Sequence, residues 1–321
     1  MTKDSIIPYS IIGSLAKIEN VYELRLFGWI LAKAQTVLKL YNKNLADINL
    51  QYALDMCEIT MPARYLLLDG DRNYKHITRA FTLANKTVEY ERNGTEYRLN
   101  IIAFPRLHKQ GGTLTFQCVI HNELWHALLN FTKGYRLINL NTYMALKSPY
   151  SIIMYMIISQ QQRQFNYTIG TLRKILGVDK LKAYDRTSNF IAKIIDKAMA
   201  DLDKHSPYTF RYGLYRAGLG GGYKEIIITP QPNKDYQAPD SPKMDREIVR
   251  QRVRLSNEVI FYLEDTFGME PKGMEAIETL LLQIGDQYAQ LNYLAGIKEY
   301  TARTRIRNAA GYLVESLRQR K

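Results

Sequence analysis

An order of elements that occurs twice along the chain constrains its fold more than any other feature. Helical segments come first, and strands joined by tight turns follow. In the first half, apolar residues recur at helical spacing between positions 24 and 41, and residues 72–86 have one apolar face, with Ile77, Ala80, Phe81 and Ala84, and one basic face. The expected strands are residues 87–91, 96–104 and 113–120. The first two are joined through Arg92-Asn93-Gly94-Thr95, in which Asn-Gly is a strong hairpin signal.

The second half repeats this order without a strong residue-by-residue repeat. The expected elements are helices at residues 150–159, 168–176 and 186–204, followed by strands at residues 208–216 and 223–229. A glycine-rich tip, residues 217–222, joins the two strands. Helices followed by a hairpin with basic residues are typical of a winged helix-turn-helix. The expected fold class is therefore α+β, with tandem winged-helix domains and a helical C-terminal extension.

Three regions are expected in the 321 residues, because the chain exceeds the usual length of one domain. The first winged-helix domain takes residues 1–140, the second takes residues 141–235, and a helical region takes residues 236–321. Residues 231–243 are rich in Pro, Asp and Asn and predict a linker. Beyond it, helices are expected near residues 244–267, 273–294 and 306–320, with Gly268, Pro271 and Gly296 as breakers.

The charge of the chain favours a polyanionic partner. Its formal net charge is +13, and residues 141–235 hold 14 Lys and Arg against 7 Asp and Glu, the largest excess for their length. Double-stranded DNA is the partner that fits a basic helix followed by a basic hairpin, because the helix can enter the major groove while the hairpin lies on the backbone. The two cysteines, Cys57 and Cys118, have no metal-ligand spacing and are expected to be buried in a reducing compartment.

Candidate DNA-binding residues follow from this placement. On the long helix, Arg186, Asn189, Lys193 and Lys197 recur at steps of three and four residues, which aligns them on one face. Taken alone, such a face is more often a solvated helix surface than a binding site. The full set of candidates is Lys182, Tyr184, Arg186, Asn189, Lys193, Lys197, Arg211, Arg216 and Lys224 in the second domain, and Lys75, Arg79, Lys86 and Arg92 in the first. For Lys75, Arg79 and Lys86 a helix surface that does not bind DNA is the stronger interpretation, because the first domain is less basic and its helix can face a partner instead.

Catalytic and cofactor motifs are not expected. The glycines of residues 218–222 lack the following helix and the Gly-Lys-Ser/Thr of a phosphate loop, and His121 and His126 lie five apart, whereas a zinc-binding pair needs four. No His pair accompanies the tyrosines as a nicking enzyme would need. We expect no enzyme, no cofactor and no metal. No segment reaches the length of a membrane span or a signal peptide, so a cytoplasmic location without membrane contact is expected.

Three segments carry a resemblance to a known family. They are SPYSIIMYMIIS at residue 148, FNYTIGTLRKILGV at residue 165, and YDRTSNFIAKIIDKAMADLDKHSPYTFRYGL at residue 184. Together they resemble the second winged-helix domain of iteron-type plasmid replication initiators, the Rep type 3 family. The segment AFPRLHKQGGTLTFQCVIHNELWHALLNFTKGYRLINL, from residue 103, is similar to the passage from the family's first domain into its second. The resemblance covers about residues 20–230.

The resemblance implies a protein that binds repeated sites at a plasmid origin as a monomer, helps to open the duplex and recruits a host initiator and the replicative helicase. It also implies that the second domain makes the principal major-groove contacts, while the first adds DNA contacts and a homodimer. A transcriptional regulator on the same fold is the alternative. The helix at residues 186–204 departs from the family pattern because it contains Asp196 and Asp201 and is therefore less basic. The tail after residue 240 lies outside the family resemblance. Its Arg303, Arg305 and Arg307 could contact DNA or another partner.

Overall fold

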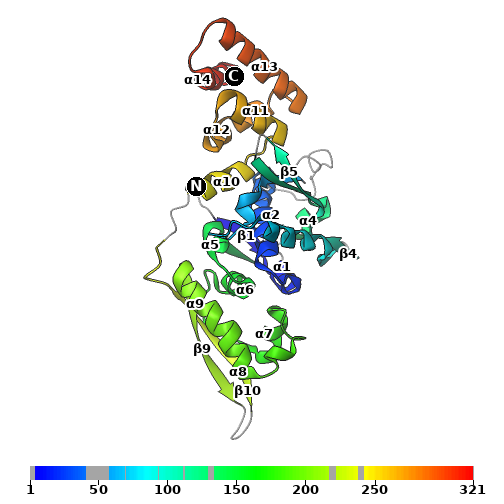
Figure 1. Ribbon diagram of the computed structural model, residues 1–321, viewed down its shortest axis with the longest axis vertical. Helices are drawn as coiled ribbons and strands as arrows, with labels where there is room; N and C mark the ends of the chain where they lie inside the picture. The colour runs from blue at the N-terminus through cyan, green and yellow to red at the C-terminus, as the bar shows by residue number, and fades with distance from the viewer. Residues whose placement is uncertain are drawn as a thin grey trace.

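The computed structural model describes residues 4–40, 58–68, 70–92, 94–110, 113–128, 134–216, 222–237 and 242–320. Three parts follow one another along the longest axis of the molecule (Figure 1). The first unit, residues 4–145, lies in the middle, the second unit, residues 149–232, at the bottom, and the tail, residues 242–320, at the top. One hydrophobic core runs through both units, and a separate core lies within the tail.

The centre of the first unit is α2 (Val21–Leu40). Its start is fixed by a reciprocal cap, because Glu23 N donates to Asn20 Oδ1 at 2.9 Å and Asn20 N donates to Glu23 Oε2 at 3.4 Å. The sequence predicted a single apolar stripe on this helix, but α2 is buried on all sides, since every residue from position 21 to 34 is buried. Even the Arg25 guanidinium is enclosed and donates to the carbonyl oxygens of Met144 and Tyr65.

The helix expected at residues 72–86 is the 3-10 helix η4 (Tyr74–Asn85). It buries Ile77, Ala80 and Leu83, which recur every three residues as a 3-10 helix requires. The spacing assumed from the sequence was that of an α-helix, and it placed Phe81 and Ala84 inward. Both are half-buried and pack against the core, so they lie on the inner face of the helix as predicted. Residues 48–56, whose sequence suits either a strand or a short helix, lie outside the described residues.

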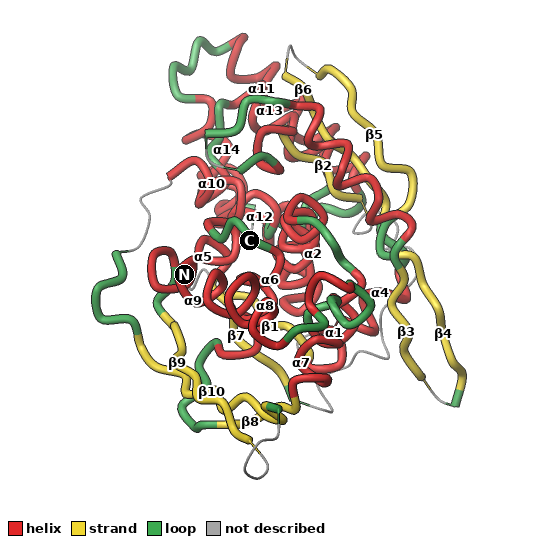
Figure 2. The backbone as a smooth tube through the Cα atoms, turned by 60° about the horizontal axis from the view of Figure 1, so that its bottom comes forward, coloured by secondary structure: helices red, strands yellow, loops and turns green. Residues whose placement is uncertain are grey.

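The sheet of the first unit consists of β2 (Glu58–Pro62), β6 (Thr113–Val119) and β5 (Ala103–Gln110), in the order β2-β6-β5. The wing is therefore the β5–β6 hairpin, and the prediction that placed it at Asn93-Gly94 is wrong. Residues 93–94 instead lie between β3 (Thr87–Arg92) and β4 (Thr95–Asn100), which form a separate two-stranded sheet that points away from the β5–β6 hairpin (Figure 2). The expected strand at residues 96–104 is divided because Ile101 and Ile102 are both buried, whereas neighbouring residues of a strand point to opposite faces.

The second unit begins with α6 (Pro149–Ile158), β8 (Phe165–Thr168) and α7 (Ile169–Ile175). After the 3-10 turn η5 (Lys182–Tyr184), the chain forms one continuous helix from Thr187 to His205, which we call the long helix. It comprises α8 (Thr187–Phe190), the π-helical turn η6 (Ile191–Ile195) and α9 (Asp196–His205). The wing strands β9 (Tyr208–Arg216) and β10 (Tyr223–Pro232) follow.

The sheet of the second unit has the order β8-β10-β9, with its first strand beside its third, as in the first unit. Both units therefore show the tandem winged-helix fold that the sequence predicted. The sequence analysis did not anticipate β8, because Phe165–Thr168 is too short for a clear alternation of apolar and polar residues. The π turn was not anticipated either, since the sequence of residues 191–195 fits an unbroken α-helix equally well.

The two units are joined by several short elements. The strand β1 (Asp4–Pro8) pairs antiparallel with β7 (Tyr135–Asn139), so the start of the chain lies beside the passage into the second unit. The remaining elements of the first unit are α1 (Tyr9–Ser14), η1 (Leu15–Lys17), η3 (Ala63–Leu66), α4 (Asn122–Leu128) and α5 (Leu140–Ala145). Cys118 is buried in β6, as predicted, whereas Cys57 lies outside the described residues.

The tail contains five described helices rather than the three predicted. They are α10 (Pro242–Gln251), α11 (Asn257–Phe267), α12 (Pro271–Leu282), α13 (Gln287–Arg303) and α14 (Ala309–Gln319). The side chains of Ser256 and Asp286 cap α11 and α13, which divides two of the predicted helices. Gly296 does not break α13. The helix α10 packs on the first unit, with Ile248 in the main core and Arg250 donating to Thr60 O at 3.3 Å.

Candidate nucleic-acid interface

The long helix presents a basic face to solvent. Lys193 and Lys197 are exposed, and within the described residues neither forms an ion pair with a carboxylate. The opposite side holds the predicted apolar stripe, with Phe190, Ile194 and Leu202 buried. Two free ammonium groups one turn apart can each contact a phosphate of a nucleic-acid backbone.

The acidic residues of the long helix point the other way. The Asp196 carboxylate accepts a hydrogen bond from Tyr212 Oη at 2.7 Å, and Asp201 accepts one from Lys147 N at 3.1 Å. Asp203 pairs with Arg211 at 3.0 Å. These carboxylates are therefore bound to β9 and to the chain before α6. The acidic residues that lie between the lysines in the sequence therefore do not neutralise Lys193 and Lys197, and the exposed face stays positively charged.

Arg173 on α7 holds the start of the long helix in place. Its Nη2 donates to Asp185 O at 2.9 Å and to Thr187 Oγ1 at 3.5 Å, and its guanidinium lies over the Phe190 ring, 5.3 Å from the centroid. Arg173 belongs to the Leu-Arg-x-x-Leu-Gly segment but was not among the predicted site residues. Because Arg173 lies on α7 and not on the long helix, the sequence gives no sign of its contact with Asp185 and Phe190 apart from the motif itself.

Replacement of Arg173 by Ala should lower the free energy of unfolding by about 1–3 kcal/mol, because a charge-assisted hydrogen bond and a ring contact are lost. Urea denaturation followed by circular dichroism measures this change. Lys174→Ala is the matched control, since Lys174 is the exposed neighbour on the same helix. Equal unfolding free energies for Arg173→Ala and Lys174→Ala would show that Arg173 does not anchor the helix.

The predicted residues before and at the start of the long helix differ in exposure. Lys182 and Arg186 are exposed, whereas Tyr184 is half-buried and packs against the core. The Asn189 side chain is half-buried as well, and its Nδ2 donates to Ala183 O at 3.4 Å. The Asn189 amide is therefore partly accessible and also closes the preceding turn, a contact that helical periodicity alone does not reveal.

The wing of the second unit carries the other candidates. Arg216 lies at the end of β9 above the Tyr223 ring, 4.2 Å from its centroid, and donates from Nη2 to Tyr223 Oη at 2.8 Å. Lys224 is exposed beside it. Arg211 lies farther from the tip, paired with Asp203, so part of its charge is compensated. Of the predicted tip, residues 217–221 lie outside the described residues.

The first unit brings together fewer free cations. Lys75 and Arg79 are exposed on η4, and the Arg79 guanidinium lies 5.9 Å from the centroid of the Tyr22 ring. Lys86 is half-buried and pairs with Glu19 at 3.2 Å. Arg92 ends β3 on the extra hairpin rather than on the wing, and its side chain lies outside the described residues. The DNA contacts assigned to these four residues stay predictions.

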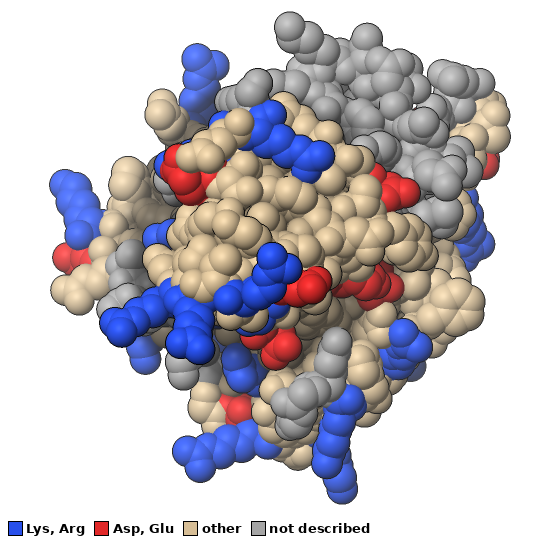
Figure 3. Space-filling model, turned by 90° about the horizontal axis from the view of Figure 1, so that it is seen from above, with Lys and Arg blue, Asp and Glu red and all other residues tan. Residues whose placement is uncertain are grey.

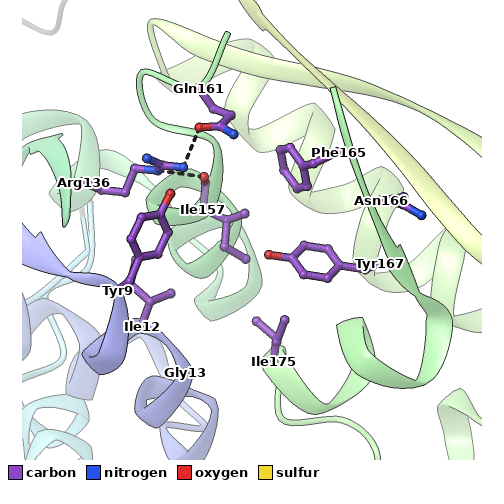
Figure 4. Close-up of a pocket in the computed structure, with 10 residues that line it drawn as sticks. All are labelled: Tyr9, Ile12, Gly13, Arg136, Ile157, Gln161, Phe165, Asn166, Tyr167 and Ile175. Carbon is purple, nitrogen blue, oxygen red and sulfur yellow. Dashed lines mark hydrogen bonds between the residues drawn. The ribbon is translucent and has the colours of Figure 1, made fainter. Parts of the chain in front are cut away.

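A cavity of about 360 Å³ separates the two units (Figure 4). Among its described lining residues, Arg136 on β7 is the one cation. The Arg136 guanidinium lies 4.4 Å from the centroid of the Tyr9 ring and donates to Ile157 O and Gln161 Oε1. Burial lowers the pKa of Arg136. Phe165 and Tyr167 of β8 form the opposite wall. Among the described residues that line this cavity, none is a carboxylate.

Two further findings concern the described residues. Among them, no group of three or more His, Cys, Asp and Glu side chains is placed to hold a metal ion. None of their helices combines the length and the apolar composition that crossing a membrane requires.

Comparison with known proteins identifies relatives of both units. Family models described as the WH1 and WH2 parts of initiator replication proteins match residues 14–159 and residues 168–218. Among solved structures, a crystal structure of the Pi initiator protein in complex with iteron DNA is similar, with a TM-score of 0.52 and 15% sequence identity over 73% of this chain and 99% of that chain. At that identity the likeness concerns the fold. The comparison with curated proteins gives no match.

Proposed function

Because this chain belongs to the family of initiator replication proteins, we propose that it binds repeated double-stranded sites at a plasmid origin, mainly through the long helix and wing of its second unit. The binding of several copies promotes opening of the adjacent duplex. The protein promotes this opening by binding alone, without a catalytic step of its own.

The orientation of charges on the long helix carries the proposal. Lys193 and Lys197 face solvent, while Asp196, Asp201 and Asp203 are bound on the inner side. The exposed Arg186 and Lys182 lie before the helix, and Arg216 and Lys224 lie on the wing. A winged helix that enters the major groove would bring these cations to the phosphates on both sides of the groove.

Selection of binding sites from random duplex DNA tests the proposal. The selected motif is then located in the DNA that surrounds the gene. Direct repeats of the motif beside an AT-rich stretch are the expected result. A single inverted repeat would indicate a transcriptional regulator, and no enrichment would contradict duplex recognition. Incubation of labelled duplex with Mg²⁺ should give no cleavage products.

Recruitment of a host initiator and of the replicative helicase is part of the proposal, as is a homodimer formed through the first unit. The support for these partners is membership of the family, since family resemblance implies both. Sedimentation of the protein with and without DNA repeats tests the homodimer: the expected result is a dimer in solution and monomers on the repeats.

A further inference from the structure

The tail separates its charges along the sequence. Residues 255–297 contain one Lys against seven Asp and Glu, whereas residues 298–320 contain six Lys and Arg against two Glu. The first segment forms α11, α12 and most of α13, and the second forms the end of α13 and all of α14. The tail is nearly neutral as a whole, but it has a basic end. Residues 242–254 also hold five Lys and Arg against two acids, but Arg250 and Arg252 are buried there and Arg246 pairs with Glu270. The exposed basic end, residues 298–320, is therefore the part of the tail that attracts a polyanion.

Three arginines occupy the turn between α13 and α14, which we call the basic corner. Arg303 ends α13, and Arg305 and Arg307 flank the half-buried Ile306 before α14 begins at Ala309. All three side chains are exposed, and within the described part of the tail none of them pairs with a carboxylate. Several Lys and Arg side chains lie side by side on this end of the molecule (Figure 3).

The backbone of the basic corner is strained at Arg305. Its φ is +56°, in the left-handed region, where glycine or asparagine is usual after the end of a helix. The turn is otherwise regular, because Thr304 N donates to Tyr300 O at 2.9 Å and Ile306 N donates to Thr301 O at 2.9 Å. An arginine in a position that favours glycine directs its side chain outward at a conformational cost, as residues in binding sites often do.

Two tyrosines lie on the helices that flank the basic corner, Tyr300 on α13 and Tyr312 on α14. Tyr300 and Tyr312 stack across the corner with ring centroids 5.5 Å apart, and Tyr300 is 48% exposed. Arginine side chains bind phosphate through two parallel hydrogen bonds, and tyrosine hydroxyl groups donate to phosphate oxygens in protein–DNA contacts. Three neighbouring arginines and an exposed tyrosine offer several hydrogen-bond donors. They therefore suit a ligand with repeating phosphates, such as a duplex backbone, better than a ligand with a single carboxylate.

We propose that the basic corner is a second DNA-binding surface, which contacts the phosphate backbone of duplex DNA independently of the long helix. The two surfaces lie at opposite ends of the longest axis (Figure 1). The basic corner therefore contacts DNA outside the site that the long helix and wing occupy. The family matches end at residue 218, so this surface adds to the contacts expected of the two units.

The test measures binding of the full chain to a random-sequence duplex over a range of salt concentrations. Replacement of Arg303, Arg305 and Arg307 together by Ala should lower the salt slope of log K by about 2 to 3, since each phosphate contact contributes about 0.9. The charge-matched control is Lys204→Ala, Arg246→Ala and Lys272→Ala together, which removes three positive charges elsewhere and should change the slope much less. Arg305→Gly alone relieves the strained turn, and it should lose one contact while the protein stays folded.

Equal salt slopes for the triple variant and its charge-matched control would overturn the inference, because net charge alone would then explain the loss. Displacement of DNA from the basic corner by poly-glutamate at equal charge concentration would overturn it too, and would indicate an acidic protein as the partner. If wild-type protein binds no duplex at all, both this inference and the proposed function fail. If only Lys193→Ala with Lys197→Ala reduces binding, the proposed function stands and this inference fails.

Discussion

The Arg250→Ala variant should lose about 3–5 kcal/mol of unfolding free energy, the cost of leaving a buried charge without its partner. Arg250 is the centre of the contact between α10, the first unit and α11. Its guanidinium lies 3.7 Å from Glu247 Oε1 and donates to Glu264 Oε1 at 3.0 Å and to Thr60 O at 3.3 Å. The side chains of Arg250 and Glu247 are only 7% and 6% exposed, so solvent does not screen their interaction.

The loss should depend on pH. Burial raises the pKa of the Glu247 carboxyl, and the nearby Arg250 opposes this rise. Without Arg250, the folded protein binds a proton at Glu247 more readily than the unfolded chain does. A carboxyl whose pKa is higher in the folded state favours folding at low pH, and this contribution disappears as the pH rises through the folded pKa. The loss of unfolding free energy in Arg250→Ala, relative to wild type, should therefore be smaller at about pH 5 than at about pH 8.

Urea denaturation at both pH values measures these effects. Arg246→Ala is the control, because Arg246 is on the same helix and pairs with Glu270 at 2.9 Å, but both side chains are more than half exposed. An exposed pair contributes at most about 1 kcal/mol. A similar small loss for Arg250→Ala would mean that the tail does not depend on this buried contact. A deficit that grows at low pH would contradict the role given to Glu247.

Replacement of Lys193 and Lys197 together by Ala should weaken binding to the selected DNA site about 30-fold at ~0.15 M salt. The estimate assumes two phosphate contacts, each contributing about 0.9 to the salt slope of log K. The slope itself should fall by about 1.8, and the difference between variant and wild type should vanish near ~1 M salt. Folding should be unaffected, since both side chains are exposed.

Fluorescence anisotropy with a labelled duplex over a salt series measures both quantities. Lys204→Ala is the matched control, because Lys204 is exposed on the same helix but near its C-terminal end. It should bind with nearly wild-type affinity. Unchanged affinity and slope for the Lys193 and Lys197 variant would place the principal contact on another surface. A weaker affinity with an unchanged slope would indicate damage to the helix rather than loss of phosphate contacts.

Much of the architecture could be read from local patterns. The glycine-rich turn and the alternating residues beside it predicted the wing of the second unit, and β9 and β10 lie where that pattern placed them. The wing of the first unit was misplaced because Asn93-Gly94 is the strongest local turn signal, whereas the three-stranded sheet pairs β5 with β6, with Gln110 opposite Thr113. Sheet membership depends on pairing with β2, which lies more than 50 residues from β6 along the chain.

The sequence by itself determined the tandem winged-helix plan, the basic character of the second unit and the position of the long helix, because periodicity and turn residues act over a few neighbours. Only the tertiary structure decided which charges are free. Asp196 meets Tyr212, Asp203 meets Arg211, and Lys86 meets Glu19. Such pairs join residues on different elements, so packing and not spacing along the chain determines which cations remain available to DNA. The same holds for the tail, where only the fold decides that Arg250 is buried while Arg303, Arg305 and Arg307 are exposed.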